Sequence, residues 1–307
     1  MRIHGISASA HQTYDWCAWK YFLQYGLGFE DYAGSAAFMG TIAHKVLEIP
    51  SRASIVKHNP NSKIWDAGYL WNICFNHYYN KEPAIAEQIE MDKLKKVCRG
   101  IHDLFDSDYS PVRDNTISAE VAFNIELTEP DFQIKSSTIN AKDPLSPVKQ
   151  EYLKLRGRID RVDQIDENTI EIIDYKTGSR VCWDSKDRHK KTPEDLYEDI
   201  QPKMYHMAAK HLYPWATNCL VTFIYITDGG PVTVPFVDGD YDITKEILKR
   251  RFKTIQANED PERNTGWKCK LCTFAKDGTC DMVWDEKNEL GMDFIINKYR
   301  ILHDRKY

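Results

Sequence analysis

The sequence lacks the long apolar segments that a membrane protein needs. No run of about 18 apolar residues occurs in its 307 residues, so no transmembrane helix is expected. The opening stretch, MRIHGISASAHQTYDWCAWK, also lacks the apolar core of a secretory signal. A cytoplasmic location is therefore the expected one.

Two further absences restrict the function. The sequence contains no Walker A motif, G-x-x-x-x-G-K-[ST], so we expect no ATP-driven motor in this chain. It also has no excess of basic residues, because 41 Lys and Arg face 46 Asp and Glu for a net charge of −5. That balance argues against a protein that simply coats nucleic acid. Two local basic clusters, 186–191 and 249–253, are either phosphate contacts or ordinary solvated charges.

The most informative stretch that is present covers residues 152–178, YLKLRGRIDRVDQIDENTIEIIDYKTG. Its two arms are rich in Ile, Val, Leu and Tyr, and Asp-Glu-Asn separates them. This pattern is typical of two antiparallel strands joined by a short turn. With the turn centred on Glu167, Asp160 lies opposite Asp174, and opposed residues share a face. Lys176 joins that face because side chains alternate along a strand.

Two carboxylates and one amine therefore converge on one spot of the predicted hairpin. Carboxylates this close repel each other, and hard oxygen ligands suit Mg²⁺ or Mn²⁺. The alternative is an ordinary Asp–Lys pair on a solvated strand face. The register decides which face Asp160 takes, since a slip of one residue would turn it to the other face of the hairpin.

The cysteines supply a second candidate metal site. Without a secretory signal, disulfides are not expected, and metal binding is the better interpretation of clustered cysteines among the eight present. Cys269, Cys272 and Cys280 offer three thiolates, one short of a four-coordinate site. Zinc, an iron–sulfur cluster or no metal all remain open from this spacing. The remaining cysteines outside the N-terminal helix are interpreted as buried apolar side chains without a metal-binding role: Cys74, Cys98, Cys182 and Cys219.

Periodicity places these motifs on a mixed set of elements. Helical spacing of apolar residues predicts helices over residues 12–25, 36–49, 64–80, 84–105, 199–212, 243–256 and 292–303. Alternation predicts strands over 118–127, 219–227 and 232–237 in addition to the hairpin. The resulting order is αβββαβ, with a mixed sheet whose two faces are buried by helices.

The segments GRIDRVD and IIDYKTG resemble the core of the PD-(D/E)xK nucleases, in the RecB-type branch. That branch includes the nuclease domains of RecB and AddB and the iron–sulfur nucleases of CRISPR adaptation. The resemblance implies an α/β fold with a restriction-endonuclease-like αβββαβ core around a central mixed sheet. It also implies three regions: a helical region at 1–110, the nuclease core at 111–260, and a cysteine-rich segment with a terminal helix at 261–307, packed on residues 1–30.

The same resemblance extends to the metal site. The segment GTIAHKVL is similar to the first motif of the family, G-x-x-x-H-x-x-L, in which the histidine gives an imidazole to the metal. His44 is the corresponding residue. The implied ligand set is His44, Asp160, Asp174 and the carbonyl of Tyr175 around Mg²⁺ or Mn²⁺, with Glu120 supporting the metal or the attacking water.

A further signature, Q-x-x-x-Y, is matched by QPKMY, in which Gln201 and Tyr205 share one helical face. Their amide and phenol are suited to bind a phosphate or to brace Lys176. Pro202 departs from the usual pattern and forces Gln201 to the helix start. Lys176 would position the attacking water or stabilise charge developing on the phosphate.

Cys17, in WCAWKYF, resembles the isolated first cysteine of the iron–sulfur members of this branch. The resemblance implies a [4Fe-4S] cluster closed by Cys17, Cys269, Cys272 and Cys280. The gap between the last two cysteines is longer than is usual for these members, so zinc stays the less favoured occupant. The expected role of the cluster is structural.

Together these features predict a metal-dependent deoxyribonuclease, favoured by analogy to be an exonuclease acting on single-stranded DNA or DNA ends. A recombination or helicase partner is expected, because the chain has no motor motif. One alternative is a non-catalytic or partner-dependent subunit that binds DNA ends in a recombination or CRISPR-adaptation complex. Another is a zinc-stabilised structural protein without metal-dependent cutting.

Overall fold

The computed structural model describes residues 3–32, 34–59, 61–134, 151–182 and 188–306, with side chains up to residue 299. Its chain forms two compact units. One consists of residues 1–32, 124–157 and 242–307, and the other of residues 33–123 and 158–241. The three-region division expected from the sequence stays a prediction. Within the described ranges, no helix is long and apolar enough to cross a membrane.

A mixed sheet forms the centre of the unit that contains residues 33–123 and 158–241. The strands are β2 (Thr116–Glu126), β5 (Lys154–Gln164), β6 (Thr169–Lys176), β7 (Asn218–Tyr225) and β8 (Gly230–Phe236). Strand β5 pairs with β2 and runs antiparallel to β6, β6 runs parallel to β7, and β7 runs antiparallel to β8. This confirms the predicted mixed sheet.

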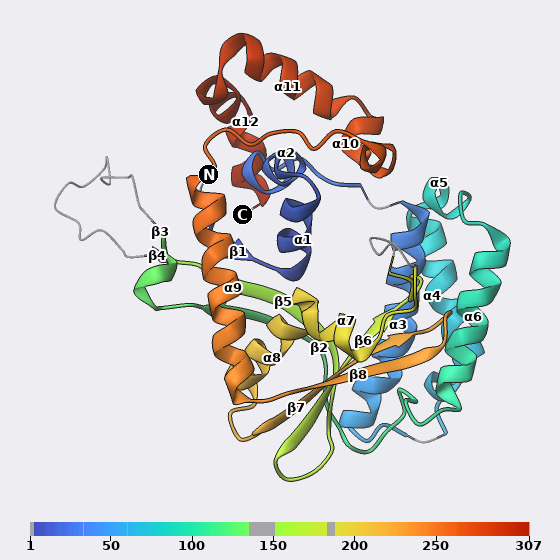
Figure 1. The fold of residues 1–307 in the computed structure, drawn as a ribbon. Coiled ribbons are helices and arrows are strands. Elements are labelled where there is room, and N and C mark those ends of the chain that lie inside the picture. The colour runs from blue at the N-terminus through green and yellow to red at the C-terminus, as the bar shows by residue number, and fades with distance from the viewer. Residues whose placement is uncertain (1–2, 33, 60, 135–150, 183–187, 307) are drawn as a thin grey trace. The chain divides into compact units, whose positions relative to one another are not determined.

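Helices cover both faces of these strands (Figure 1). The helical segments are α3 (Ser35–Ile55), η2 (Lys63–Trp65), α4 (Ala67–Lys81), α5 (Pro83–Ala86), α6 (Met91–Phe105), α7 (Pro193–Glu198) and α8 (Ile200–Leu212). Apolar residues of α3, α4 and α6 pack in one core with Ile173, Tyr175 and Ile224 of the sheet. Helix α8 packs on β7. Because side chains alternate, Asp174 and Lys176 face away from the α3–α4–α6 core.

The helix boundaries differ from the expected ones in several places. The single helix expected over 12–25 is divided at Cys17, whose backbone is extended, and the one expected over 64–80 is divided at Asp66, which caps α4. Helix α3 does not stop at Ile49 but continues through Pro50 to Ile55. Pro50 is buried, and we attribute the continuation of the helix to this burial, which compensates for the backbone hydrogen bond that proline cannot make. The continuous helix expected over 84–105 is instead divided into α5 and α6, because residues 87–90 form a turn. Gly100 allows α6 to pack closely, since an added Cβ would overlap the Ile226 carbonyl oxygen.

The other unit joins the beginning of the chain to its end. Trp19, Phe22 and Leu23 form an apolar core with Phe274 and Val283, and Figure 1 shows α10–α12 beside α2. Strand β1 pairs in parallel with the start of β5. The elements are β1 (Gly5–Ile6), α1 (Ala8–Trp16), α2 (Ala18–Tyr21), the π-helix η1 (Phe22–Gly26), η3 (Pro130–Phe132), β3 (Gln133–Ile134), β4 (Glu151–Tyr152), α9 (Asp238–Ala257), η4 (Trp267–Leu271), α10 (Thr273–Lys276), α11 (Thr279–Leu290) and α12 (Met292–Lys306).

The basic clusters noted in the sequence are engaged with carboxylates. Lys249 and Lys253 on α9 both contact Asp131, and Arg251 contacts Asp15. In the other cluster, Lys190 lies 3.1 Å from Asp228, while residues 186 and 187 lie outside the described ranges. Ion pairing therefore accounts for most of the described charges of these clusters.

Candidate active site

The hairpin of β5 and β6 brings two carboxylates together. Arg161 pairs with Ile173, and the next position in this antiparallel register sets Asp160 opposite Asp174. Both are nearly inaccessible, with exposed fractions of 9% and 3%. The backbone N–H of Tyr175 donates to Asp160 Oδ2 at 2.8 Å, which fixes one carboxylate against the neighbouring strand.

Lys176 is held in place by both β6 and α8. Its Nζ lies 2.7 Å from Asp174 Oδ2 and donates to Gln201 Oε1 at 2.8 Å. Its cation also lies 4.5 Å from the centre of the Phe223 ring. The other Asp174 oxygen, Oδ1, accepts from Gln201 Nε2 at 3.0 Å and from Tyr205 OH at 2.7 Å. Asp174 and the amine of Lys176 are therefore held by one connected set of hydrogen bonds, whereas Asp160 is held separately by the Tyr175 N–H.

The start of α8 explains how Gln201 reaches this group. Asp199 caps the helix and accepts from the Gln201 backbone N–H at 3.0 Å, so Gln201 lies in the first turn, followed by Pro202. Tyr205 lies one turn further on the same face. Burial and the nearby carboxylates raise the pKa of Tyr205 well above its usual value, so its hydroxyl stays a donor to Asp174.

His44 and Glu120 approach Asp160 from two other elements. His44 on α3 places Nδ1 3.2 Å from Asp160 Oδ1. One donor atom each of His44, Glu120 and Asp160 lies within 4.8 Å of the other two. Asp174 is not a member of this tight group, since it faces Lys176, Gln201 and Tyr205 instead.

Glu120 reaches the group through an unusual backbone conformation. Its φ of +53° lies in the left-handed region although it is inside strand β2. Its carboxylate also accepts from Arg158 at 3.2 Å. Residues in this conformation concentrate at functional sites, where the surrounding structure compensates for their strain.

The pKa values of Asp160, Glu120 and His44 are all raised, as expected where several carboxylates lie close together. Burial raises the pKa of Asp160, and the charge of Asp174 raises it further. Burial and the charge of Asp160 likewise raise the pKa of Glu120. Burial alone would lower the pKa of His44, but the hydrogen bond to Asp160 and the surrounding carboxylates raise it to about 9. These residues therefore fit a divalent cation, whose charge would favour the ionised carboxylates.

A cleft of about 520 Å³ opens over these residues. Its lining includes His44, Glu120 and Asp160 together with two cationic side chains, Lys45 and Arg158. Neither cation was predicted from the sequence. For Arg158 a signal existed, because it precedes Asp160 by two residues and so shares its strand face. For Lys45 no signal existed, because only the fold determines which turn of α3 borders the cleft.

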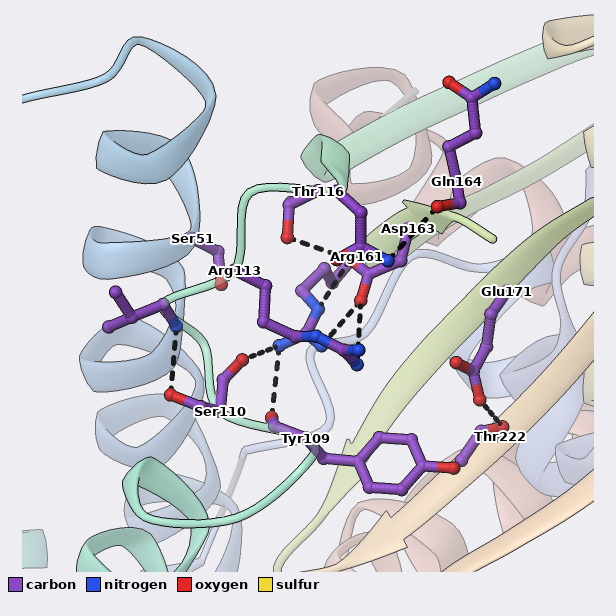
Figure 2. A network of polar contacts seen from close by, with 12 residues as sticks. Ser51, Tyr109, Ser110, Arg113, Thr116, Arg161, Asp163, Gln164, Glu171 and Thr222 are labelled. Carbon is purple, nitrogen blue, oxygen red and sulfur yellow. Dashed lines mark hydrogen bonds and ion pairs between the residues drawn. The ribbon is translucent and has the colours of Figure 1, made fainter. Parts of the chain in front are cut away.

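A buried polar network supports the hairpin from behind (Figure 2). The guanidinium of Arg161, which is fully buried, donates to both Asp163 oxygens at 2.9 and 2.8 Å and to Tyr175 OH at 2.9 Å. It also donates to the backbone carbonyls of Tyr109 and Ser110. Tyr175, whose carbonyl the resemblance makes a metal ligand, thus turns its ring away from the two acids. This network ties the register of both strands to the loop after α6.

The four candidate cluster cysteines lie together in the other unit. Cys17, at the junction of α1 and α2, lines a small cavity of about 20 Å³ with Cys269, Cys272 and Cys280. Burial raises the pKa of Cys280 to about 11. Arg263 lines the same cavity, and its charge opposes that rise.

Comparisons with known proteins agree with this geometry. A profile of the PD-(D/E)XK nuclease superfamily matches residues 5–276. One subunit of an ATP-dependent helicase/deoxyribonuclease from Streptococcus uberis is 26% identical over 184 residues, which make up 58% of this chain and 14% of that protein. The chain therefore spans only about one seventh of that relative's length.

A solved structure of a candidate exonuclease from Eubacterium rectale has a TM-score of 0.51 and 12% identity, over 89% of this chain and 88% of that one. At this identity the likeness shows the fold alone. The profile match, in contrast, includes every element that carries a residue of the site. The chain belongs to the PD-(D/E)XK nuclease superfamily.

Proposed function

We propose that this protein is a divalent-metal-dependent deoxyribonuclease. The observation that carries the proposal is the pair of buried carboxylates, Asp160 and Asp174, with the half-buried amine of Lys176 beside Asp174 and with Asp160 lining an open cleft. A structural role alone would not require two facing carboxylates whose burial raises the pKa of one of them. Membership in a nuclease superfamily supports the same chemistry.

The metal, Mg²⁺ or Mn²⁺, would be held by His44, Glu120 and Asp160, with Asp174 opposite Asp160 on the neighbouring strand. A bound divalent ion supplies an acidified water and screens the scissile phosphate. Around it, Asp160 is oriented by the Tyr175 backbone N–H, and Asp174 is oriented by Tyr205. Both carboxylates are therefore preorganised and need not rearrange when the substrate binds.

Lys176 would act on the phosphate or on the attacking water. Gln201 and Asp174 fix its amine, so that its position is set before the substrate arrives. Lys45 and Arg158 line the cleft and would neutralise backbone phosphates on either side of the bond to be cut. Specificity for sequence is not expected, because these contacts address only the phosphate backbone.

Exonuclease action on single strands or DNA ends is the form of activity that we propose. The chain has no Walker A motif and so would depend on another protein to open a duplex. A relative that matches part of this chain is named as a subunit of an ATP-dependent helicase/deoxyribonuclease. A helicase or recombination partner is accordingly part of the proposal.

The four cysteines would hold a structural [4Fe-4S] cluster. One N-terminal cysteine and a C-terminal trio line the same cavity, which is the cysteine set of the iron–sulfur nucleases that the chain resembles. Zinc stays the less favoured occupant.

A cleavage assay on end-labelled single-stranded DNA tests the proposal. Wild-type protein should cut with Mn²⁺ or Mg²⁺ and stop on addition of a chelator. Lys176→Ala should lower the cleavage rate by about 100-fold or more, because it removes a group that acts in the transition state. DNA affinity, measured by fluorescence anisotropy, should change little.

The matched control is Lys93→Ala, which removes an exposed amine of α6 whose ion pair is with Glu90. This control should cut like the wild type. Equal cleavage by Lys176→Ala and Lys93→Ala would remove Lys176 from the mechanism. Metal-independent binding of DNA without any cutting would favour the non-catalytic subunit instead.

A further inference from the structure

A second group of metal-binding side chains lies between β6 and α8, apart from the residues discussed above. Val181 and Lys190 form an antiparallel bridge, and the Cys182 N–H donates to the His189 carbonyl at 2.9 Å. The Lys191 N–H donates to the Arg180 carbonyl at 2.8 Å, which closes the base of this short ladder. The ladder therefore holds Cys182 and His189 directly across from each other.

Asp195 on α7 completes the group. One donor atom each of Cys182, His189 and Asp195 lies within 4.8 Å of the other two. Asp195 Oδ2 is 2.8 Å from His189 Nε2 and also accepts from the Thr192 N–H at 2.8 Å. The carboxylate is therefore fixed by the capping box of α7.

We propose that Cys182, His189 and Asp195 form a zinc site. A thiolate, an imidazole and a carboxylate are the three ligand types that Zn²⁺ takes in proteins. Tetrahedral Zn²⁺ separates such ligands by roughly 3.2–3.8 Å, so movements of about 1 Å would complete the geometry. Binding releases the thiol proton of Cys182, and the fourth position is left to water. One Zn²⁺ balances the charges of one thiolate and one carboxylate.

The cations around the site do not oppose this assignment. Lys190 lies 3.1 Å from Asp228, and Lys191 lies 3.4 Å from Asp199, so carboxylates compensate both charges. Arg188 is exposed, so solvent screens its charge. The site differs in ligand set and in chain position from the four cysteines of the other unit.

The position of the site suggests what the ion would do. The group joins the paired residues 181–182 and 189–190 to α7, in the connection between Lys176 at the end of β6 and Gln201 at the start of α8. Asp199, which caps α8 and bonds the Gln201 N–H, follows α7 directly. Zinc would thus restrain the segment that connects β6 to α8, the two elements that carry Lys176 and Gln201. Its role would be structural rather than catalytic.

Zinc content measured by mass spectrometry tests the proposal on the full-length protein. Protein saturated with ZnCl₂ and passed through a desalting column would be compared for wild type, Cys182→Ser, His189→Ala and Cys98→Ser. The last variant is the matched control, because it removes a thiol of α6 outside both groups. The wild type and the control should each retain one more equivalent of zinc than the two ligand variants.

A chelator competition gives the second measurement. Loss of one of three ligands should weaken this zinc site by about 100-fold or more, since even outer partners of metal ligands contribute 10–100-fold. Co²⁺ should give thiolate-to-metal absorption that Cys182→Ser diminishes and Cys98→Ser does not. Equal zinc content and equal competition curves in all four proteins would overturn the proposal, whether or not the protein cuts DNA. His189→Ala keeps every thiol and therefore tests the site even if Cys182→Ser folds poorly.

Discussion

At the scale of single residues, Glu120 differs most from what its sequence context suggests. Its alternation within a strand was predictable, but its φ of +53° was not, because no local residue pattern specifies a left-handed glutamate. The conformation aims the carboxylate at Asp160 and His44. It is expected to cost about 1–2 kcal/mol relative to ordinary backbone.

This strain yields a prediction with a definite sign. Glu120→Gly and Glu120→Ala both remove the carboxylate, but only glycine adopts φ +53° without strain. The glycine variant should therefore be the more stable by about 1 kcal/mol. In an ordinary strand, alanine would be the more stable of the two. Urea unfolding followed by circular dichroism measures the difference, and a more stable alanine variant would contradict the strain.

The pairing of Asp160 with Asp174 was predictable from the local sequence pattern alone. The period of two along a strand and a turn centred on Glu167 were sufficient to place both acids on one face, and the register agrees. The bonds of Gln201 to Lys176 and Asp174 join segments separated by a whole helix. Only the resemblance to a family suggested them, because local periodicity says nothing about such distant contacts.

At the scale of elements, segments with strong periodicity were predicted correctly from the sequence, whereas short or polar segments were not. The hairpin, α8 and α9 follow clear patterns, whereas β1 has two residues and α7 has six. Segments this short carry no measurable period. The Arg161–Asp163 pair was also missed, because a charged pair inside a strand resembles an exposed face until its burial is known.

Helix α8 contains a buried histidine, His206, from which we predict how stability depends on pH. His206 is fully buried and stacks on Phe236, with ring centres 5.3 Å apart. In the described part of the chain, neither of its ring nitrogens has a hydrogen-bond partner. Burial, aided by the charge of Lys210, lowers the pKa of His206 to about 4.

The pH dependence follows from the difference between the folded and unfolded states. An unfolded histidine titrates near 6.5, so between about pH 6.5 and pH 4 the unfolded chain binds a proton that folded His206 does not. Stability should therefore fall as the pH drops through this window, by at most about 3 kcal/mol from this residue. His206→Leu should lose that part of the slope in urea unfolding. His77→Gln, a change on α4, should keep it, and identical slopes in both variants would refute the assignment.

At the scale of the whole molecule, the predicted order αβββαβ and the mixed sheet are confirmed. Core apolar residues of α3, α4 and α6 were visible in the sequence as helical periodicity. The association of the first helices with the C-terminal segment was not visible in periodicity, because Trp19 and Phe274 are far apart in the chain. The cysteine spacing and the family resemblance were its only signals.

The cysteines carry a prediction at this scale. Cys17→Ala and Cys272→Ala should each give a colourless protein that folds poorly, because the cluster would close a loop of about 255 residues. Cys98→Ser should stay coloured and stable. Visible absorption after anaerobic purification and thermal unfolding provide the measurements. Brown colour and full thermal stability in the Cys17 and Cys272 variants would rule out the cluster.

The central claim is that the paired acids at the hairpin hold a metal that makes the protein a nuclease. The most direct test compares wild type with Asp174→Asn on end-labelled single-stranded DNA, with Mn²⁺ and with chelator. We predict cutting by the wild type only with metal, and a rate at least about 100-fold lower for folded Asp174→Asn. Equal cutting by both proteins, or cutting by the wild type that persists in chelator, would contradict it.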